Sequence, residues 1–198
     1  MDGRSPRDAE SVVGPVPGGR DPDAYDRLRR RILWAMPAGL YVVGSRGGRG
    51  PDGVARNLMT CNWCQQVSVR PKMLAVSIDG EAVTAGLVRA GGVFSVNLLD
   101  REDRAIVRRY VKPVTDAVLD AEGRVTSMAG QPTVEAATGA PILAGAAAWL
   151  DCEVRHEVPL GSHVLFVGEV VDAGVGAGGA DGLERVLRME DTRMSYGG

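Results

Sequence analysis

The sequence is short of cysteine and histidine and has no excess of charge of either sign, and the first and last of these features each exclude a class of protein. It has three cysteines and two histidines among 198 residues. An odd and small number of cysteines, with no signal-peptide pattern before them, excludes a secreted disulfide framework. We therefore expect a reducing compartment, the cytoplasm. The 23 basic and 25 acidic residues leave a net charge of −2, which excludes the basic surface that nucleic-acid and membrane-surface proteins use.

Long apolar runs and aromatic residues are also scarce. The longest run of apolar or small residues, Ile142–Leu150, has nine residues, whereas a membrane-spanning helix needs roughly 20. The chain is long enough for one domain with a sizeable core. Because aromatic residues make up only 5% of it and 27 residues are glycine, we expect Val, Leu and Ala to fill that core.

The chain divides into a tail and one domain. Residues 1–22 contain four prolines among glycines and charges and cannot bury enough apolar surface to offset their ordering entropy, so we predict a disordered tail. Residues 23–198 form the predicted domain. It opens with an amphipathic helix that has Asp23 as its N-cap and that ends before Pro37.

Short β-type runs separated by few helices follow that first helix. Such a pattern is typical of a mainly β, antiparallel barrel and not of a parallel α/β sheet. We predict helices over Val83–Arg89 and Arg101–Tyr110, and loops over Gly47–Gly53 and Gly174–Gly182. The predicted strands are Leu40–Val43, Val67–Val69, Met73–Ile78, Val93–Leu98, Ala148–Val154 and His163–Val171.

The segment Asn57–Pro71 combines small hydrogen-bonding side chains with one tryptophan immediately before a predicted strand. A planar, acceptor-rich ligand such as a flavin needs donors at its edge and an apolar wall on its face, and this segment can supply both. From composition alone, a polar edge strand with a buried tryptophan is the favoured interpretation of the segment.

Four motifs in order give the chain a resemblance to a known family. They are the loop Thr60-Cys61-Asn62 running to Val67–Pro71, the strand through Ser77-Ile78 to Thr84, the run Gly92–Leu99, and Ala146–Val154 followed by Gly161–Val170. Over residues 23–198 the chain resembles the flavin reductase family, which has the FMN-binding split β-barrel fold, antiparallel and of Greek-key type.

The resemblance implies a homodimer in which FMN, or FAD, lies in a groove near the interface, with NAD(P)H as co-substrate. It places Ser77, Ala82 and Thr84 at the ribityl chain and phosphate, where Thr84 would open a helix whose N-terminus attracts anions; an ordinary N-cap is the alternative for Thr84. Arg70 and Arg89 would add positive charge. The residues implied at the isoalloxazine are Met59, Thr60, Cys61, Asn62 and Trp63, and Tyr196 belongs to a closing segment near the flavin or the dimer interface.

His163 is the predicted catalytic residue. In the family, the matching histidine follows Gly-Asp, whereas the triplet here is Gly161-Ser162-His163. The resemblance implies that His163 orients the nicotinamide or stabilises negative charge on the reduced flavin. The alternative is a surface histidine at a turn. Trp63 also departs from the family, where a small residue is common, and predicts a bulkier wall beside the ring.

The cysteines and nearby acidic residues have simpler interpretations. Cys61, Cys64, Cys152 and His156 make a Cys3His set on paper. In a continuous strand, however, Cys61 and Cys64 would face opposite sides, so we predict buried thiols and no metal. We interpret Asp151, Glu153 and Glu157 as solvated charges.

Together these observations predict an FMN-dependent NAD(P)H:flavin oxidoreductase that supplies reduced flavin to a partner monooxygenase. Two alternatives stay open. One is a flavin- or haem-binding electron carrier with little nicotinamide activity, and the other is a flavoenzyme that acts directly on an organic substrate. No nucleic-acid or membrane partner is expected.

Overall fold

The computed structural model describes residues 15–50 and 53–192. The described residues divide into two compact units, residues 15–37 and residues 38–192. Tyr196 and most of the predicted tail lie outside the described residues. No helix within the described ranges is long and apolar enough to cross a membrane.

The first unit consists mainly of helix α1 (Pro22–Trp34), which begins slightly earlier than the sequence predicts. Asp21, not Asp23, is the N-cap, and its carboxylate accepts a hydrogen bond from the backbone N–H of Ala24 at 2.8 Å. Pro22 fits the first helical position because its nitrogen has no hydrogen to leave unpaired. Asp23 lies in the first turn instead, where its charge favours the positive end of the helix dipole.

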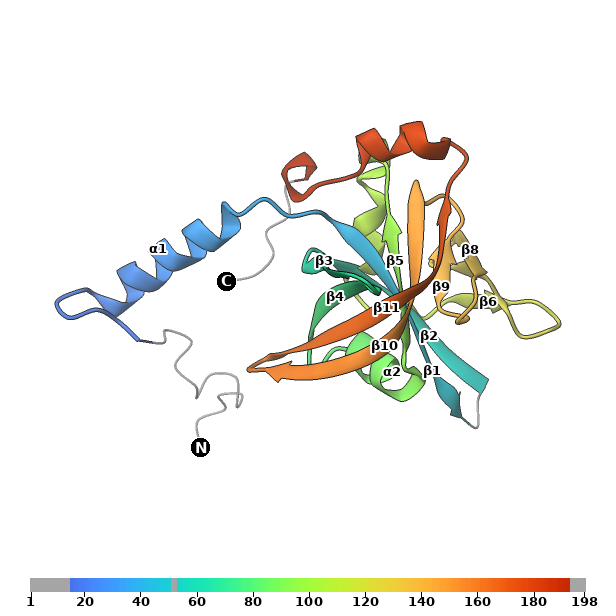
Figure 1. Cartoon of the computed structure of the whole chain (residues 1–198), viewed down its shortest axis with the longest axis horizontal. Coiled ribbons are helices and arrows are strands. Elements are labelled where there is room, and N and C mark those ends of the chain that lie inside the picture. The colour runs from blue at the N-terminus through green and yellow to red at the C-terminus, as the bar shows by residue number, and fades with distance from the viewer. Residues whose placement is uncertain (1–14, 51–52, 193–198) are drawn as a thin grey trace. The chain divides into compact units, whose positions relative to one another are not determined.

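The second unit is built on a seven-stranded antiparallel sheet with the order β2-β1-β5-β10-β11-β4-β3 (Figure 1). Strands β10 and β11 come late in the chain but lie between β5 and β4, a non-sequential order of the Greek-key type. The predicted mainly β, antiparallel fold is confirmed. The strands are β1 (Tyr41–Gly50), β2 (Gly53–Cys61), β3 (Cys64–Val69), β4 (Lys72–Asp79), β5 (Val93–Leu98), β10 (Ala148–Leu160) and β11 (His163–Val175).

The two edge strands of this sheet, β2 and β3, are consecutive in the chain. Only Asn62 and Trp63 separate them, and two residues with their flanking bonds span at most roughly 10 Å. The sheet must therefore curl until its edges come together at these two residues. Because no ladder joins β2 to β3, the result is a barrel split along one seam.

The interior of the barrel is filled by inward-facing aliphatic residues and two phenylalanines. Gly168 is needed there because a Cβ at this position would lie 2.5 Å from the ring of Phe94. Helix α2 (Val83–Gly91) covers the core through Ala85 and Val88. The largest members of the core cluster are Val43, Leu74, Val76, Ile78, Phe94, Val96, Val164 and Phe166.

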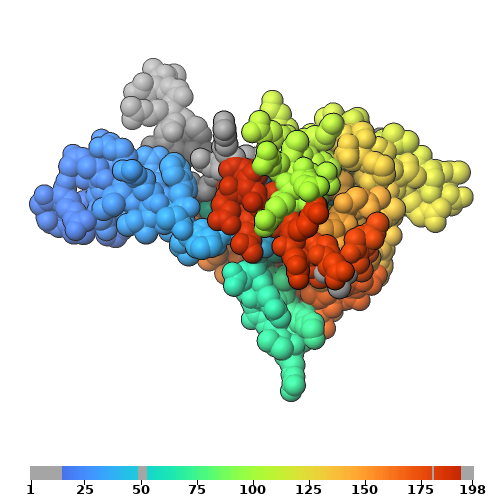
Figure 2. All heavy atoms as spheres, turned by 90° about the horizontal axis from the view of Figure 1, so that it is seen from above, coloured from blue at the N-terminus to red at the C-terminus, as the bar shows by residue number. Residues whose placement is uncertain are grey.

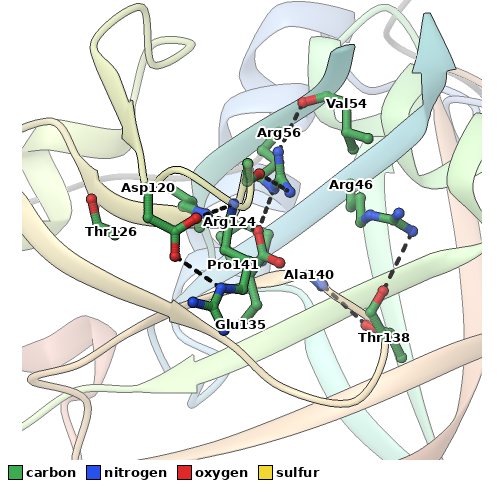
Figure 3. A network of polar contacts seen from close by, with 12 residues as sticks. Arg46, Val54, Arg56, Asp120, Arg124, Thr126, Glu135, Thr138, Ala140 and Pro141 are labelled. Carbon is green, nitrogen blue, oxygen red and sulfur yellow. Dashed lines mark hydrogen bonds and ion pairs between the residues drawn. The ribbon is translucent and has the colours of Figure 1, made fainter.

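A second sheet of four short strands, which the sequence did not predict, packs beside the barrel. It comprises β6 (Ala117–Leu119), β7 (Val125–Met128), β8 (Gln131–Glu135) and β9 (Pro141–Leu143). A buried ion pair fastens it, with Arg56 Nε on β2 lying 2.6 Å from Glu135 Oε1 on β8 (Figure 3). Asp151 adds a further tie because its carboxylate accepts hydrogen bonds from Thr138 N–H at 2.8 Å and Thr138 Oγ1 at 2.6 Å.

Asp151 therefore corrects one sequence expectation. It is fully buried and not a solvated charge, and burial raises the pKa of its carboxyl group above the ordinary value, although the Thr138 hydrogen bonds oppose that shift.

Several predicted boundaries were also wrong. The expected loop at Gly47–Gly53 is largely strand, because β1 runs to Gly50 and pairs with β2 up to Gly50 opposite Gly53. The expected helix at Arg101–Tyr110 is two 3₁₀ helices, η2 (Arg101–Asp103) and η3 (Ile106–Tyr110). In the C-terminal region β11 continues to Val175, and η4 (Gly179–Arg185) and η5 (Met189–Asp191) follow.

The last 3₁₀ helices pack beside η2. Figure 2 shows these C-terminal segments, in red, beside the lime-coloured segment that contains η2 and η3. Arg185 pairs with Asp100 at 3.0 Å, and the N–H of Leu187 donates to the carbonyl of Leu99 at 2.8 Å. The segment around Arg185 and Leu187 therefore covers the C-terminal end of β5.

Candidate functional site

The seam of the barrel is held by the backbone of β4. The N–H of Ser77 donates to the carbonyl of Trp63 at 2.9 Å, and the Cys61 thiol lies 3.8 Å from the carbonyl oxygen of Ser77. Both ends of the two-residue crossing are thus fixed to the same strand. This leaves the Trp63 side chain 41% exposed, so the predicted buried tryptophan of an edge strand is not what the fold contains.

Two turns lie side by side next to this seam. In the β4–β11 ladder His163 is opposite Asp79, and the N–H of Gly80 donates to the carbonyl of Ser162 at 3.0 Å. The N–H of Ala82 then donates to the carbonyl of Asp79 at 2.9 Å. The β10–β11 turn is therefore fastened to the turn that leads into helix α2.

The side chains of Trp63 and His163 meet at this place. Their ring centroids are 4.8 Å apart and their planes are inclined by 63°, an edge-to-face contact. Ser162 Oγ lies 2.8 Å from Nδ1 of His163. Three separate parts of the chain, the seam, the end of β4 and the start of β11, thus form one patch that includes the predicted residues Trp63, Ser77, Ala82 and His163.

Helix α2 begins at the same patch with Ala82 as its N-cap, and no side chain caps it. The first N–H groups of a helix have no partner within it, so this end can bind an anion through the backbone. The alternative role given to Thr84 from the sequence, that of an ordinary N-cap, was therefore wrong. The side chain of Thr84 is 1% exposed, and its hydroxyl accepts a hydrogen bond from Asn57 Nδ2 at 2.9 Å.

The segment before the seam also turns two of its predicted side chains inward. Thr60 is buried and donates to the carbonyl oxygen of Val107 at 2.5 Å, and Cys61 is 5% exposed. Met59 packs partly against the core. Thr60 and Cys61 can therefore meet a ligand only through their backbone, whereas Asn62 and Trp63 have side chains at the surface. The expected loop at Thr60–Asn62 is strand as far as Cys61.

The three thiols belong to the core and form no metal centre. Burial raises the pKa of Cys61 to about 11 and that of Cys152 to about 12, and it raises the pKa of Cys64 further. All three are protonated at neutral pH. Within residues 15–50 and 53–192, no group of three or more His, Cys, Asp and Glu residues could hold a metal ion. The expectation that Cys61 and Cys64 face opposite sides of one strand was wrong, because β2 ends at Cys61 and β3 begins at Cys64, and both thiols pack against the same core.

The structure does not bring the two predicted arginines to the start of α2. Arg89 lies in the last turn of that helix, where its Nε pairs with Glu157 Oε1 at 2.7 Å. Arg70 follows β3 at the turn into β4, and this turn is at the opposite end of β4 from Asp79. Any anion at the first turn of α2 is therefore held mainly by backbone N–H groups.

Two residues whose side chains hold this region in place were not singled out by sequence reasoning. Asn57 links Thr84 to the N–H of Val114, which donates to Asn57 Oδ1 at 2.9 Å, and so fixes α2 to β2. Ser162 was noted only for the aspartate it replaces, although its hydroxyl contacts His163 directly. A polar residue beside a candidate catalytic histidine in a tight turn is the signal that could have identified Ser162.

Comparison with known proteins places the whole barrel in one family. Residues 33–191 match the family described as the flavin reductase like domain. This range includes every strand of both sheets and all the residues of the patch.

Individual relatives agree with that match. A NADH-dependent FAD reductase of Streptomyces globisporus is 30% identical over 152 residues, 76% of this chain and 78% of that protein. A NADH-dependent FMN reductase of Streptomyces nodosus subsp. asukaensis is 32% identical over 143 residues, 71% of this chain and 70% of that protein. The styrene monooxygenase flavin reductase of Pseudomonas putida S12 is 25% identical, with a TM-score of 0.58 over 75% of this chain and 87% of that structure.

Proposed function

Because the chain belongs to the flavin reductase-like family, we propose that it is a flavin reductase that oxidises NADH, works with FMN and delivers reduced flavin to a separate monooxygenase. The observation that carries this proposal is the convergence of Trp63, His163 and the first turn of α2 at the barrel seam. That patch offers an aromatic wall, a hydrogen-bonding imidazole and an anion-binding helix end within one matched domain.

The residues of the patch fit a flavin mononucleotide. The first turn of α2, uncapped by any side chain, suits the phosphate. In this proposal Ser77 and Ala82 contact the ribityl chain between the phosphate and the ring. The backbone of residues 59–63 and the side chains of Asn62 and Trp63 then contact the edge and the face of the isoalloxazine ring. When bound, a flavin supplies the hydride-accepting and electron-donating chemistry.

The chain's own residues bind and orient the reactants. His163 contacts the wall formed by Trp63, and in this proposal it hydrogen-bonds the nicotinamide. Trp63 shields one side of the reacting rings from water. No protein side chain needs to form a covalent bond in this scheme, and the protonated thiols of the core are not required for it.

The proposal of a partner monooxygenase is supported by the relative that serves styrene monooxygenase. FMN is preferred to FAD because a mononucleotide needs only one anion site, and α2 offers one at the patch. The relatives' names include both flavins, so the assay described below compares the two.

We further propose a homodimer. Exposed apolar side chains lie on the edge strand β3, at Val67 and Val69, and on the part of β10 that has only β11 as a neighbour, at Val158 and Leu160. A second copy would remove this surface from water. Sedimentation equilibrium tests this proposal, and a monomer at micromolar concentration would contradict it.

The function is tested by mixing the purified protein with NADH and FMN, or FAD, and following the loss of nicotinamide absorbance. We expect oxidation of NADH far faster than with free flavin alone, and faster with FMN than with FAD. An electron carrier would bind flavin without this turnover, and turnover equal to that of free flavin would overturn the reductase proposal.

A further inference from the structure

The turn Gly161-Ser162-His163 fixes the serine hydroxyl against the histidine ring. Gly161 adopts a positive φ of 58°, a conformation that glycine reaches without strain. The carbonyl of Ser162 accepts a hydrogen bond from Gly80 at 3.0 Å, and His163 is in ladder register with Asp79. With the backbone held on both sides, the 2.8 Å separation between Ser162 Oγ and His163 Nδ1 is a built-in contact.

Trp63 provides the second support for the imidazole. Its indole meets the ring edge to face at 4.8 Å, and its own backbone is fixed by the hydrogen bond from Ser77 to the Trp63 carbonyl. The imidazole is therefore held at one nitrogen and along one side. Within residues 15–50 and 53–192, the imidazole ring of His163 has Ser162 as its hydrogen-bond partner, and the contact is made at Nδ1. Nε2 is left for a ligand.

The chemistry of a hydroxyl allows the proton of the ring to lie on Nε2. A hydroxyl can donate as well as accept, whereas an ionised carboxylate can only accept. When Ser162 donates to an unprotonated Nδ1, the proton of the neutral imidazole must be on Nε2. This is also the tautomer that free neutral histidine prefers in water, and the hydroxyl can satisfy Nδ1 of that form by donating, whereas an ionised carboxylate cannot.

We propose that Ser162 is a positioning residue that holds neutral His163 as the Nε2–H tautomer, with Trp63 supporting the ring, so that the imidazole presents a hydrogen-bond donor to its ligand. The ligand group that fits a donor is a carbonyl oxygen, and the carboxamide oxygen of a nicotinamide has that chemistry. The identity of this ligand rests on the proposed function, but the tautomer does not.

Nitrogen NMR of the ring tests the tautomer without any turnover. The chain has only two histidines, so ¹⁵N-histidine labelling of the full chain gives two imidazoles, and His156→Gln identifies the signals of His163. The spectrum is recorded as the pH is raised until the ring nitrogen signals stop moving, so that the neutral imidazole is observed. We expect Nε2 to be the protonated nitrogen.

Three variants make this result specific. Ser162→Thr keeps a hydroxyl and should keep the Nε2–H form, Ser162→Ala should give a mixture of tautomers, and Ser162→Asp should move the proton to Nδ1 because a carboxylate must accept. A wild-type spectrum with the proton on Nδ1, or an unchanged tautomer in Ser162→Asp, would overturn the proposal.

Steady-state kinetics test the consequence for the ligand. In Ser162→Ala, where a mixture of tautomers is expected, the KM for NADH should rise about twofold, because only the fraction with the proton on Nε2 can donate to the ligand, with a smaller change in kcat and with recovery in Ser162→Thr. Equal KM values in Ser162→Ala and wild type would contradict the donor role. If the wild-type chain proves not to reduce flavin, the proposed function fails while the NMR result still decides the tautomer.

Discussion

Trp63, between β2 and β3, and His163, at the start of β11, meet edge to face with 4.8 Å between their ring centroids. The contact exists because the sheet curls until its edges meet at the two residues that connect β2 and β3. Trp63 stands at that meeting point, and the β4–β11 ladder brings His163 to it. The split in the barrel is thus what creates the candidate site.

We expect Trp63→Ala to weaken FMN binding by about 1 kcal/mol, the scale of an aromatic contact, while Trp63→Phe retains most of the affinity. The measurement is a fluorescence titration with FMN. Val118→Ala, an exposed position on β6 of the second sheet, is the control and should bind FMN as wild type does. If Trp63→Ala binds equally well, the ring does not lie against Trp63.

Thr84 is expected to matter for stability more than for direct contact with phosphate. Removing its hydroxyl leaves the buried Asn57 amide without its partner, so Thr84→Val should lower the free energy of unfolding by about 1–3 kcal/mol. Thr84→Ser keeps the hydroxyl and is the control. Urea unfolding measures the effect. A stable Thr84→Val variant that has lost FMN affinity would instead support a direct phosphate contact.

The second sheet should depend on the ion pair between Arg56 and Glu135. Both side chains are largely buried, so Glu135→Ala leaves a buried guanidinium uncompensated and should cost about 3–5 kcal/mol. Arg124→Ala removes an exposed ion pair with Asp120 (Figure 3) and should change the unfolding midpoint far less, because solvent screens the two charges. Similar unfolding midpoints for the two variants would contradict this difference.

Sequence reasoning succeeded where local pattern and packing agree. The strand Val93–Leu98 was predicted with its observed bounds and α2 nearly so, because their apolar residues recur at the period of the element that they form. Sequence reasoning failed where pairing with a distant strand determines the secondary structure. The glycine- and arginine-rich end of β1 has little strand propensity and is strand only because β2 pairs with it.

The small sheet and the geometry of the site were also not predicted, because residues distant in the sequence determine them. Strands β6 to β9 are three to five residues long and are fixed by distant partners such as Arg56 on β2. Asp151 was interpreted as solvated because nothing nearby in the sequence signals that Thr138 satisfies both of its oxygens. The residues of the site were predicted through the family resemblance, but the contact between Trp63 and His163 depends on the curl of the whole sheet.

The raised pKa values of the buried thiols predict how the free energy of unfolding depends on pH. Cys61 and Cys152 have pKa values raised from 9.0 to about 11 and about 12 in the folded chain, so the unfolded chain ionises first as the pH rises. Their contribution to stability is complete below about pH 9 and should be lost progressively as the pH rises from there through about 11 to 12.

The rate of alkylation by iodoacetamide checks the same values. At pH 7 the folded chain should react at Cys61 and Cys152 only as fast as it unfolds, and urea should accelerate the reaction strongly. Rapid labelling of either thiol in the folded chain would show that it is exposed or ionised.

The central claim is that the seam of the barrel is the place where NADH reduces FMN. The most direct measurement compares wild type and His163→Ala by rapid mixing of the flavin-loaded protein with NADH, with FMN affinity measured in parallel and His156→Ala as the control. The account predicts that His163→Ala lowers the rate of flavin reduction at least tenfold, on the scale of one lost hydrogen bond, with a much smaller change in FMN affinity. Reduction of flavin by His163→Ala at the wild-type rate would contradict it.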